Sequence, residues 1–323
     1  MNYQYILMPF IASLILTLVL TIVFRFLGKR GFLGNLYTNV RGGTPRALGI
    51  VPFILLSLYF PTAFPAGFNN LILIIGIFAL FDDLIGRRRV GNFPIEWGQL
   101  SRGIGMMAVM IVGFPLVGYS AILIALLVQP INISDMQPGS TSIVVILMSI
   151  FTILAMLLLG VGLIPSVPGY YAPLAPLLLL TVCIGYSPLD FAGKIMLGEV
   201  GNHSFAVALG LCFYLLGGFW WTLILFIATT ILIALVRRNN LRKFFAIKLG
   251  LRNPTFGDYF MDVLTGGGLG DVFRRIILRK KQYAVNNQIF VSLGFRRLLY
   301  NPFAHRIQYT HNKYQASSAL ERK

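Results

Sequence analysis

Charged side chains are scarce in this chain of 323 residues, where they make up only 11% of the sequence. Soluble domains carry about 25% charged residues and about 45–50% apolar ones. Apolar types account for 57% of this chain, and its mean hydropathy is +0.78. The composition therefore excludes a soluble globular enzyme and indicates an all-α polytopic membrane protein.

Cysteine is also scarce, with two copies in the whole chain. Cys183 and Cys212 both lie in apolar runs, so we expect them to behave as small hydrophobic residues. Two such cysteines exclude a disulfide framework and a Cys-x-x-Cys metal site. The apolar run at 6–24 has neither a basic region before it nor a small-residue cleavage site after it, which predicts a retained first span rather than a signal peptide.

Negative charge is the rarer sign, and the excess of positive charge is unevenly distributed. Residues 1–236 carry 10 Lys and Arg against 6 Asp and Glu, whereas residues 237–323 carry 17 against 4. We therefore predict a transmembrane domain at 1–236 and a basic cytoplasmic or membrane-surface segment at 237–323. A basic segment beside a membrane favours anionic lipids as its partner. Nucleic acid is not expected, because no nucleic-acid-binding fold is recognisable.

Four long stretches without any charged residue divide the first part of the chain. They contain 35, 32, 54 and 37 residues, and a helix needs about 20 residues to cross the hydrocarbon. Each stretch is therefore long enough for two helices. With the first helix this predicts about nine transmembrane helices, at 5–24, 47–62, 69–86, 100–116, 119–135, 141–163, 171–188, 202–217 and 218–236. All charged residues then lie on one side, which the Lys and Arg bias makes cytoplasmic, with the N-terminus outside and the C-terminus inside.

Four carboxylates lie at the cytoplasmic ends of these predicted helices, where acidic residues in membrane proteins are typical of functional sites. They are Asp82, Asp83, Asp135 and Glu199. Mg²⁺ needs only one or two carboxylates when phosphate oxygens complete its coordination. Arg46, Arg102 and Lys194 lie at the same level, and basic residues suit a phosphate-rich substrate. Taken singly, each carboxylate could equally end a helix and pair with an arginine, so the argument depends on their joint occurrence.

Four short motifs stand at these helix ends, in segments 39–50, 81–83, 132–135 and 196–201. They read Asn-Val-Arg-Gly-Gly-Thr-Pro-Arg-Ala-Leu-Gly-Ile, Phe-Asp-Asp, Asn-Ile-Ser-Asp and Met-Leu-Gly-Glu-Val-Gly. In the same order they resemble the first cytoplasmic loop and the Asp-Asp, Asn-x-x-Asp and Gly-Asp-x-Gly motifs of the polyprenyl-phosphate N-acetylhexosamine-1-phosphate transferases. This family, glycosyltransferase family 4, includes the phospho-N-acetylmuramoyl-pentapeptide transferases. The resemblance covers roughly residues 5–236.

The resemblance implies a reaction at the cytoplasmic face of the cell membrane. A sugar-1-phosphate would pass from a UDP-sugar to a polyprenyl phosphate, leaving a lipid-diphosphate sugar and UMP. Such a transfer is the first membrane step in assembling a cell-wall or surface glycan. A homodimer is compatible with the family.

The resemblance also implies roles for individual residues. Glu199 would be the principal ligand of Mg²⁺, or of Mn²⁺ in its place, with Asp83 as a second ligand. Asp82 or Asp83 would position or deprotonate the lipid phosphate, while Asp135 and Asn132 would organise the nucleotide or a metal-bound water. The expected substrate contacts are Asn132, Thr44, Arg46, Arg102 and Lys194.

Departures from the family pattern leave other interpretations open. Glu199 stands where the family has Asp, Gly86 replaces a frequent third acidic residue, and His305 and His311 lack the spacing of a His-rich loop. The second interpretation is a catalytically degenerate homologue that binds lipid phosphate or UDP-sugar as a scaffold. A transporter ranks third, because transporters place charged sites near the bilayer midplane, whereas every charged residue of this chain is predicted to lie at one face of the membrane. We expect His203 to be a polar residue at a helix start rather than a ligand.

Overall fold

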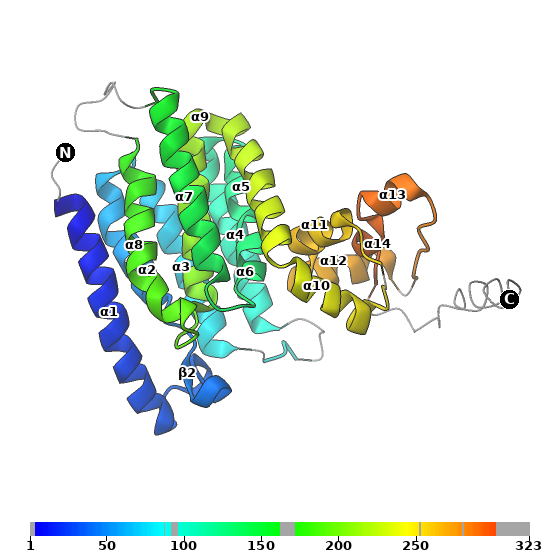
Figure 1. The fold of residues 1–323 in the computed structure, drawn as a ribbon, viewed down its shortest axis with the longest axis horizontal. Helices are drawn as coiled ribbons and strands as arrows, with labels where there is room; N and C mark the ends of the chain where they lie inside the picture. Colours follow the sequence, from blue (N-terminus) through cyan, green and yellow to red (C-terminus); the bar gives the residue numbers. More distant parts are fainter. Residues whose placement is uncertain are drawn as a thin grey trace, which may run out of the picture. The chain divides into compact units, whose positions relative to one another are not determined.

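The computed structural model describes residues 4–86, 88–91, 96–161, 172–251, 253–279 and 281–301. Helices account for 76% of the structure, and the described strands are β1 (Tyr37–Thr38) and β2 (Thr44–Pro45), which pair antiparallel (Figure 1). The prediction of an all-α protein is therefore confirmed. His305 and His311 lie outside the described residues, as does much of the predicted turn between the sixth and seventh spans.

The chain divides into two compact units, with the boundary between Lys243 and Phe244. Composition had suggested a boundary at 236 and 237. The helices of the first unit are α1 (Gln4–Lys29), α2 (Ile50–Tyr59), α3 (Phe68–Ile85), α4 (Trp97–Val117), α5 (Ser120–Leu126), α6 (Val128–Ser134), α7 (Ser140–Leu158), α8 (Leu174–Phe191) and α9 (Gly198–Val236). Three single turns of 3₁₀ helix add to these, at Gly34–Leu36, Val40–Gly42 and Phe60–Thr62.

Six helices are long and apolar enough to cross a membrane. They are α1, α3, α4, α7, α8 and α9. Large apolar side chains on their outer faces are exposed, among them Ile22, Ile111 and Leu158, as expected for surfaces that face lipid instead of water. The described part of the chain therefore has the helices of a membrane protein, as the composition predicts.

Helix α9 is the central element of the first unit. Helices α2, α3, α5, α6, α7 and α8 all pack against it, and residues 200–213 are all buried. The helix is broken at Gly217 and Gly218. Gly218 has a φ of 69°, which residues other than glycine rarely adopt. This break falls where the sequence predicts the turn between the last two spans.

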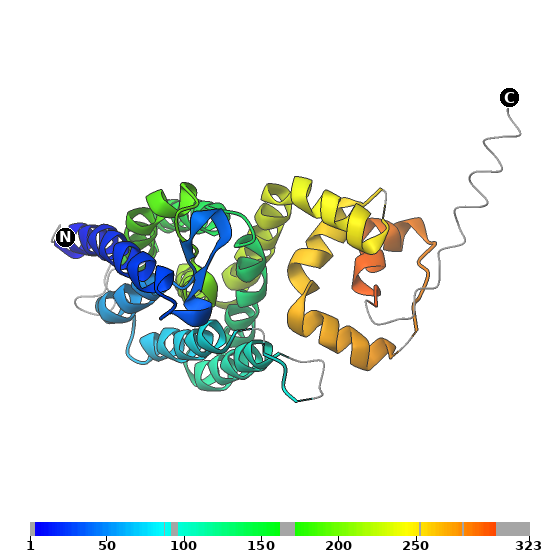
Figure 2. The ribbon, with the colours of Figure 1, turned by 90° about the horizontal axis from the view of Figure 1, so that it is seen from below.

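The loop that carries β1 and β2 lies at one end of the bundle, facing the viewer in Figure 2. It is fixed to the segment before α9 by three backbone hydrogen bonds. These run from Met196 N to the Pro45 carbonyl (2.9 Å), from Leu48 N to the Met196 carbonyl (3.3 Å) and from Gly49 N to the Leu197 carbonyl (2.9 Å). A Cβ at Gly49 would lie 2.2 Å from the Leu197 oxygen. Glycine is therefore needed for the first loop to reach the start of α9.

The second unit is a group of short helices. It contains a π-helical turn (Phe245–Leu249), α11 (Phe256–Thr265), α12 (Gly268–Leu278), α13 (Gln288–Ser292) and α14 (Phe295–Leu298), and α10 (Arg238–Phe244) leads into it from α9. The Phe245 ring stacks on Tyr259 with centroids 5.5 Å apart. Ion pairs join Asp258 to Arg296 and Asp262 to Arg297, and both carboxylates are buried.

Candidate functional site

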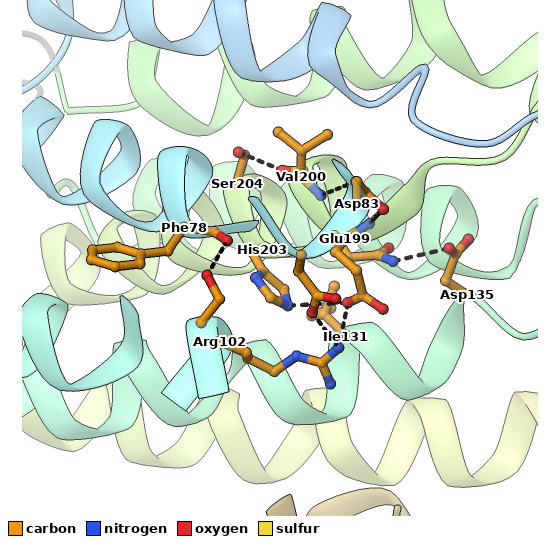
Figure 3. A network of polar contacts seen from close by, with 12 residues as sticks. Phe78, Asp83, Arg102, Ile131, Asp135, Glu199, Val200, His203 and Ser204 are labelled. Carbon is orange, nitrogen blue, oxygen red and sulfur yellow. Dashed lines mark hydrogen bonds and ion pairs between the residues drawn. The ribbon is translucent and has the colours of Figure 1, made fainter. Parts of the chain in front are cut away.

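Residues from three of the four sequence motifs, together with Arg102, form a polar cluster around the first turns of α9 (Figure 3). Asp82 and Asp83 belong to the last turns of α3, Arg102 to α4, and Asn132 to α6. Each hydrogen-bonds or ion-pairs directly or through one side chain with residues at the start of α9. The prediction that carboxylates distant in sequence share one end of the bundle is therefore supported by their contacts.

Arg102 is the centre of this cluster. Its Nη2 atom lies 3.2 Å from Asp82 Oδ2 and 2.7 Å from Glu199 Oε2. With its amide turned to satisfy both neighbours, Asn132 donates to Glu199 Oε2 (2.9 Å) and accepts from Arg102 Nη2 (3.2 Å). Because buried carboxylates need a compensating charge, the guanidinium allows two of them to share one site. Gly98 leaves room for this arrangement, since a Cβ there would lie 1.9 Å from Asp82 Oδ1.

Asp83 holds the start of α9. Its carboxylate accepts hydrogen bonds from the backbone N–H groups of Glu199 (3.1 Å) and Val200 (2.9 Å). A carboxylate at a helix N-terminus satisfies free N–H groups and interacts favourably with the helix dipole. Asp83 therefore positions Glu199 through the backbone. Its role as a metal ligand remains a prediction.

His203 joins the site, although the sequence predicts only a polar residue at a helix start. It is fully buried, and its Nε2 atom lies 3.3 Å from Glu199 Oε2. The signal was present in the spacing, because residues four apart on a helix face the same side. The structure thus places the imidazole of His203 beside the carboxylate of Glu199, and both residues belong to the same helix.

Asp135 lies on a neighbouring polar chain of contacts. Its Oδ2 atom accepts from Asn202 Nδ2 at 2.9 Å, and Asn202 Oδ1 accepts from Thr141 Oγ1 at 3.5 Å. Thr141 in turn shares a hydrogen bond of 2.7 Å with Ser134. Asp135 is therefore joined to the cluster through α9, because Asn202 follows Glu199 by less than one turn.

The remaining predicted substrate contacts differ in where the structure places them. The Thr44 hydroxyl is buried and donates to the Val40 carbonyl at 2.8 Å, so it stabilises its own loop. Arg46 is half-buried, and its positive charge acts on both Asp82 and Glu199. Lys194 is exposed, and its backbone carbonyl accepts from Arg25 (3.0 Å). Of these three residues, Arg46 is the one whose charge reaches the cluster.

The donor set suits a metal that is shared with phosphate. Within the described residues no group of three or more His, Cys, Asp or Glu side chains could hold a metal ion alone. Mg²⁺ in phosphate-binding sites commonly uses one or two protein carboxylates and takes its other ligands from phosphate and water. Asp82 and Glu199 each direct one oxygen at the same nitrogen of Arg102. Two carboxylates that already converge on one cation fit that requirement.

The chemical capacity of the site follows from this geometry. Two carboxylates, a guanidinium, an amide and an imidazole meet at one end of a membrane bundle. Such an arrangement can bind anions through its cations and a divalent cation through its carboxylates. Comparison of the chain with models of protein families and with curated proteins finds no match. Assignment of an activity therefore depends on the motifs and on their convergence around Arg102 and Glu199.

Proposed function

We propose that this protein transfers a sugar-1-phosphate from a UDP-sugar to a polyprenyl phosphate at the cytoplasmic membrane face. The observation that carries the proposal is the meeting of Asp82 and Glu199 on Arg102. These residues come from two of the four motifs that resemble the transferase family, and such a meeting is not required if each motif merely ends a helix. The product would begin the assembly of a cell-wall or surface glycan.

In this reaction an oxygen of the lipid phosphate forms a bond to the β-phosphorus of the UDP-sugar. The bond from that phosphorus to the oxygen bridging it to the α-phosphate breaks, and UMP leaves. A phosphate monoester is already largely ionised at neutral pH, because its second pKa is about 6. The protein therefore has to bring two anions together and orient them, more than it has to remove a proton.

The side chains of the cluster suit this task. Arg46 and Arg102 attract the phosphates, and Asp82 orients the attacking lipid phosphate. Asn132 and His203 hold the Glu199 carboxylate in place. Asp82 and Glu199 would bind Mg²⁺, which supplies neutralisation of the diphosphate charge. Asp135 offers a polar group for the nucleotide end, as the Asn-x-x-Asp motif leads us to expect, and Asn202 donates a hydrogen bond to it.

The proposal includes nine membrane crossings, with the N-terminus outside and the C-terminal unit in the cytoplasm. Support comes from the three places where the structure has shorter or broken helices. Helix α2 with its 3₁₀ turn, the pair α5 and α6, and the two parts of α9 each overlap predicted spans. An odd number of crossings puts the two ends of the chain on opposite sides, so that the basic C-terminal segment faces the cytoplasm when the N-terminus is outside, as the positive-inside rule favours.

One observation favours the alternative of a non-catalytic homologue. Arg102 pairs with both carboxylates, so a divalent cation would have to compete with a resident guanidinium for them. The replacement of the family's Asp by Glu199 points the same way. A protein of this kind would still bind lipid phosphate or UDP-sugar through Arg46 and Arg102 and act as a scaffold.

UMP release by the purified full chain distinguishes the two functions. The assay uses polyprenyl phosphate, Mg²⁺ and a panel of UDP-sugars, and UDP-sugar binding is measured in parallel. We expect Mg²⁺-dependent release that Glu199→Gln and Asp82→Asn each lower by roughly a hundredfold or more, the scale of one lost preorganised electrostatic contact. Asp271→Asn, in the second unit, serves as the control. Binding without UMP release from any sugar would overturn the transferase and establish the scaffold.

A further inference from the structure

Helix α12 buries the charged side chain of Arg274 and exposes three large apolar side chains. Arg274 is only 6% exposed, where it pairs with Asp271 and donates to Thr265 Oγ1 at 3.1 Å. By contrast, the side chains of three large apolar residues lie on the outside of the helix. Phe273 is 62% exposed, Ile276 66% and Ile277 74%.

These three residues form one stripe, because positions three and four apart share a helix face. Exposed apolar side chains scattered singly are normal on proteins, whereas a contiguous exposed patch marks an interaction site. The stripe cannot turn inward, since the opposite face of α12 is occupied by Arg274 and the buried Leu278. The exposure therefore follows from how the helix is fixed in its unit.

The charge around the stripe is positive. The three aspartates in the described part of the second unit each pair with an arginine: Asp258 with Arg296, Asp262 with Arg297, and Asp271 with Arg274. Two basic residues just after α12 are exposed. They are Arg279 and Lys281.

We propose that α12 is an interfacial helix that docks on an anionic lipid surface. Phe273, Ile276 and Ile277 enter the boundary between headgroups and acyl chains, while Arg279 and Lys281 meet lipid phosphates. Helices of this kind combine a large apolar face with a basic polar one. A nucleic acid would match the charge but leaves the apolar stripe in water. The proposal is independent of the transfer reaction.

The connection to a membrane helix and the size of the apolar stripe both favour lipid as the occupant. The chain runs from α9, a helix able to cross a membrane, through α10 directly into the second unit. This connection keeps the unit near a bilayer, and tethering raises the effective concentration of a weak binding surface. Each exposed apolar side chain that enters the interface is worth roughly tenfold in partitioning, so three together suffice for docking once the unit is tethered.

The test places a spin label on the full chain in lipid nanodiscs. Ile276→Cys carries the label on the stripe, and Asn286→Cys carries it at an exposed polar position of the same unit. Native Cys183 and Cys212 are fully buried, so they do not compete for the label. Collision with oxygen, which concentrates in hydrocarbon, is compared with collision with a water-soluble nickel chelate. The nanodiscs contain phosphatidylcholine with or without phosphatidylglycerol.

We expect the ratio of oxygen to nickel collision at position 276 to rise several-fold in phosphatidylglycerol nanodiscs, and position 286 to stay water-accessible. The double variant Arg279→Gln with Lys281→Gln should lower the ratio at 276 toward its phosphatidylcholine value. Equal nickel access at both positions in every lipid would overturn the proposal. Low collision rates with both oxygen and the nickel chelate at position 276 would also overturn it, because the stripe would then be covered by a second copy or another protein rather than by lipid.

Discussion

At the residue scale, the central feature is the sharing of one guanidinium by two carboxylates. Asp82 and Glu199 lie on different helices, and both contact Arg102 Nη2. A buried carboxylate pair without a cation is strongly unfavourable, because both charges lose their hydration and repel each other. Arg102 therefore contributes to the stability of the bundle as well as to its proposed anion binding.

Arg102→Leu tests this contribution. We expect the apparent free energy of unfolding in detergent micelles to fall by about 3–5 kcal/mol at neutral pH, the scale of breaking a buried ion pair. Adding Asp82→Asn to Arg102→Leu should restore part of the loss, because one of the two uncompensated charges is then removed. Additive effects of the two substitutions would contradict the coupling, since contacting residues are expected to interact.

At the scale of elements, the start of α9 organises the site. Asp83 caps it, Glu199 and His203 lie on its first two turns, and Asn202 reaches Asp135. Gly198 makes this start compatible with the first loop. Its φ is 69°, and a Cβ there would lie 2.6 Å from the Arg46 carbonyl oxygen and 2.9 Å from Asp83 Oδ2.

Gly198→Ala should therefore destabilise the protein by two separate effects. Backbone strain at positive φ costs about 1 kcal/mol or more, and the new methyl group displaces the Asp83 cap. Gly218→Ala is a matched control, because Gly218 has the same φ of 69° but a Cβ there meets nothing within 4 Å. Thermal unfolding in micelles should show a larger loss for Gly198→Ala. Equal losses would mean that the contact with Asp83 contributes nothing.

At the scale of the whole molecule, the open question is how often the chain crosses the membrane. Six helices satisfy the length and hydropathy of a span, whereas nine crossings are proposed. Whether the pair α5 and α6 crosses the membrane decides whether the first unit has an odd or an even number of crossings. Tyr119 precedes this pair and Met136 follows it, and both are exposed.

Labelling with a membrane-impermeant thiol reagent tests the crossing. Tyr119→Cys should react in intact cells, and Met136→Cys should react only in inverted membrane vesicles, because the helices between them span the bilayer. Background labelling should be low, since Cys183 and Cys212 are fully buried. Reaction of both positions from the same side would show that α5 and α6 form a re-entrant pair and would remove one crossing.

Much of the architecture could be predicted without tertiary contacts. Scarce charge and long uncharged stretches identify membrane helices, because hydrocarbon excludes unpaired charge over about 20 residues. Turn residues such as Gly217 and Gly218 mark where helices break. The clustering of charge at helix ends was sufficient to predict that Asp82, Asp135 and Glu199 occupy one end of the bundle.

What each of these side chains contacts was decided only by the tertiary structure. Sequence spacing places Glu199 and His203 on one face of α9, but it cannot show that Arg102 bridges Glu199 to Asp82. Asp83 had the same motif context as Asp82, yet it caps α9 because its side chain meets that helix end. Charge patterns reflect whether each segment lies in water or in hydrocarbon, so they can be recognised from the local sequence. Partners across helices depend on packing, which is set by the whole bundle.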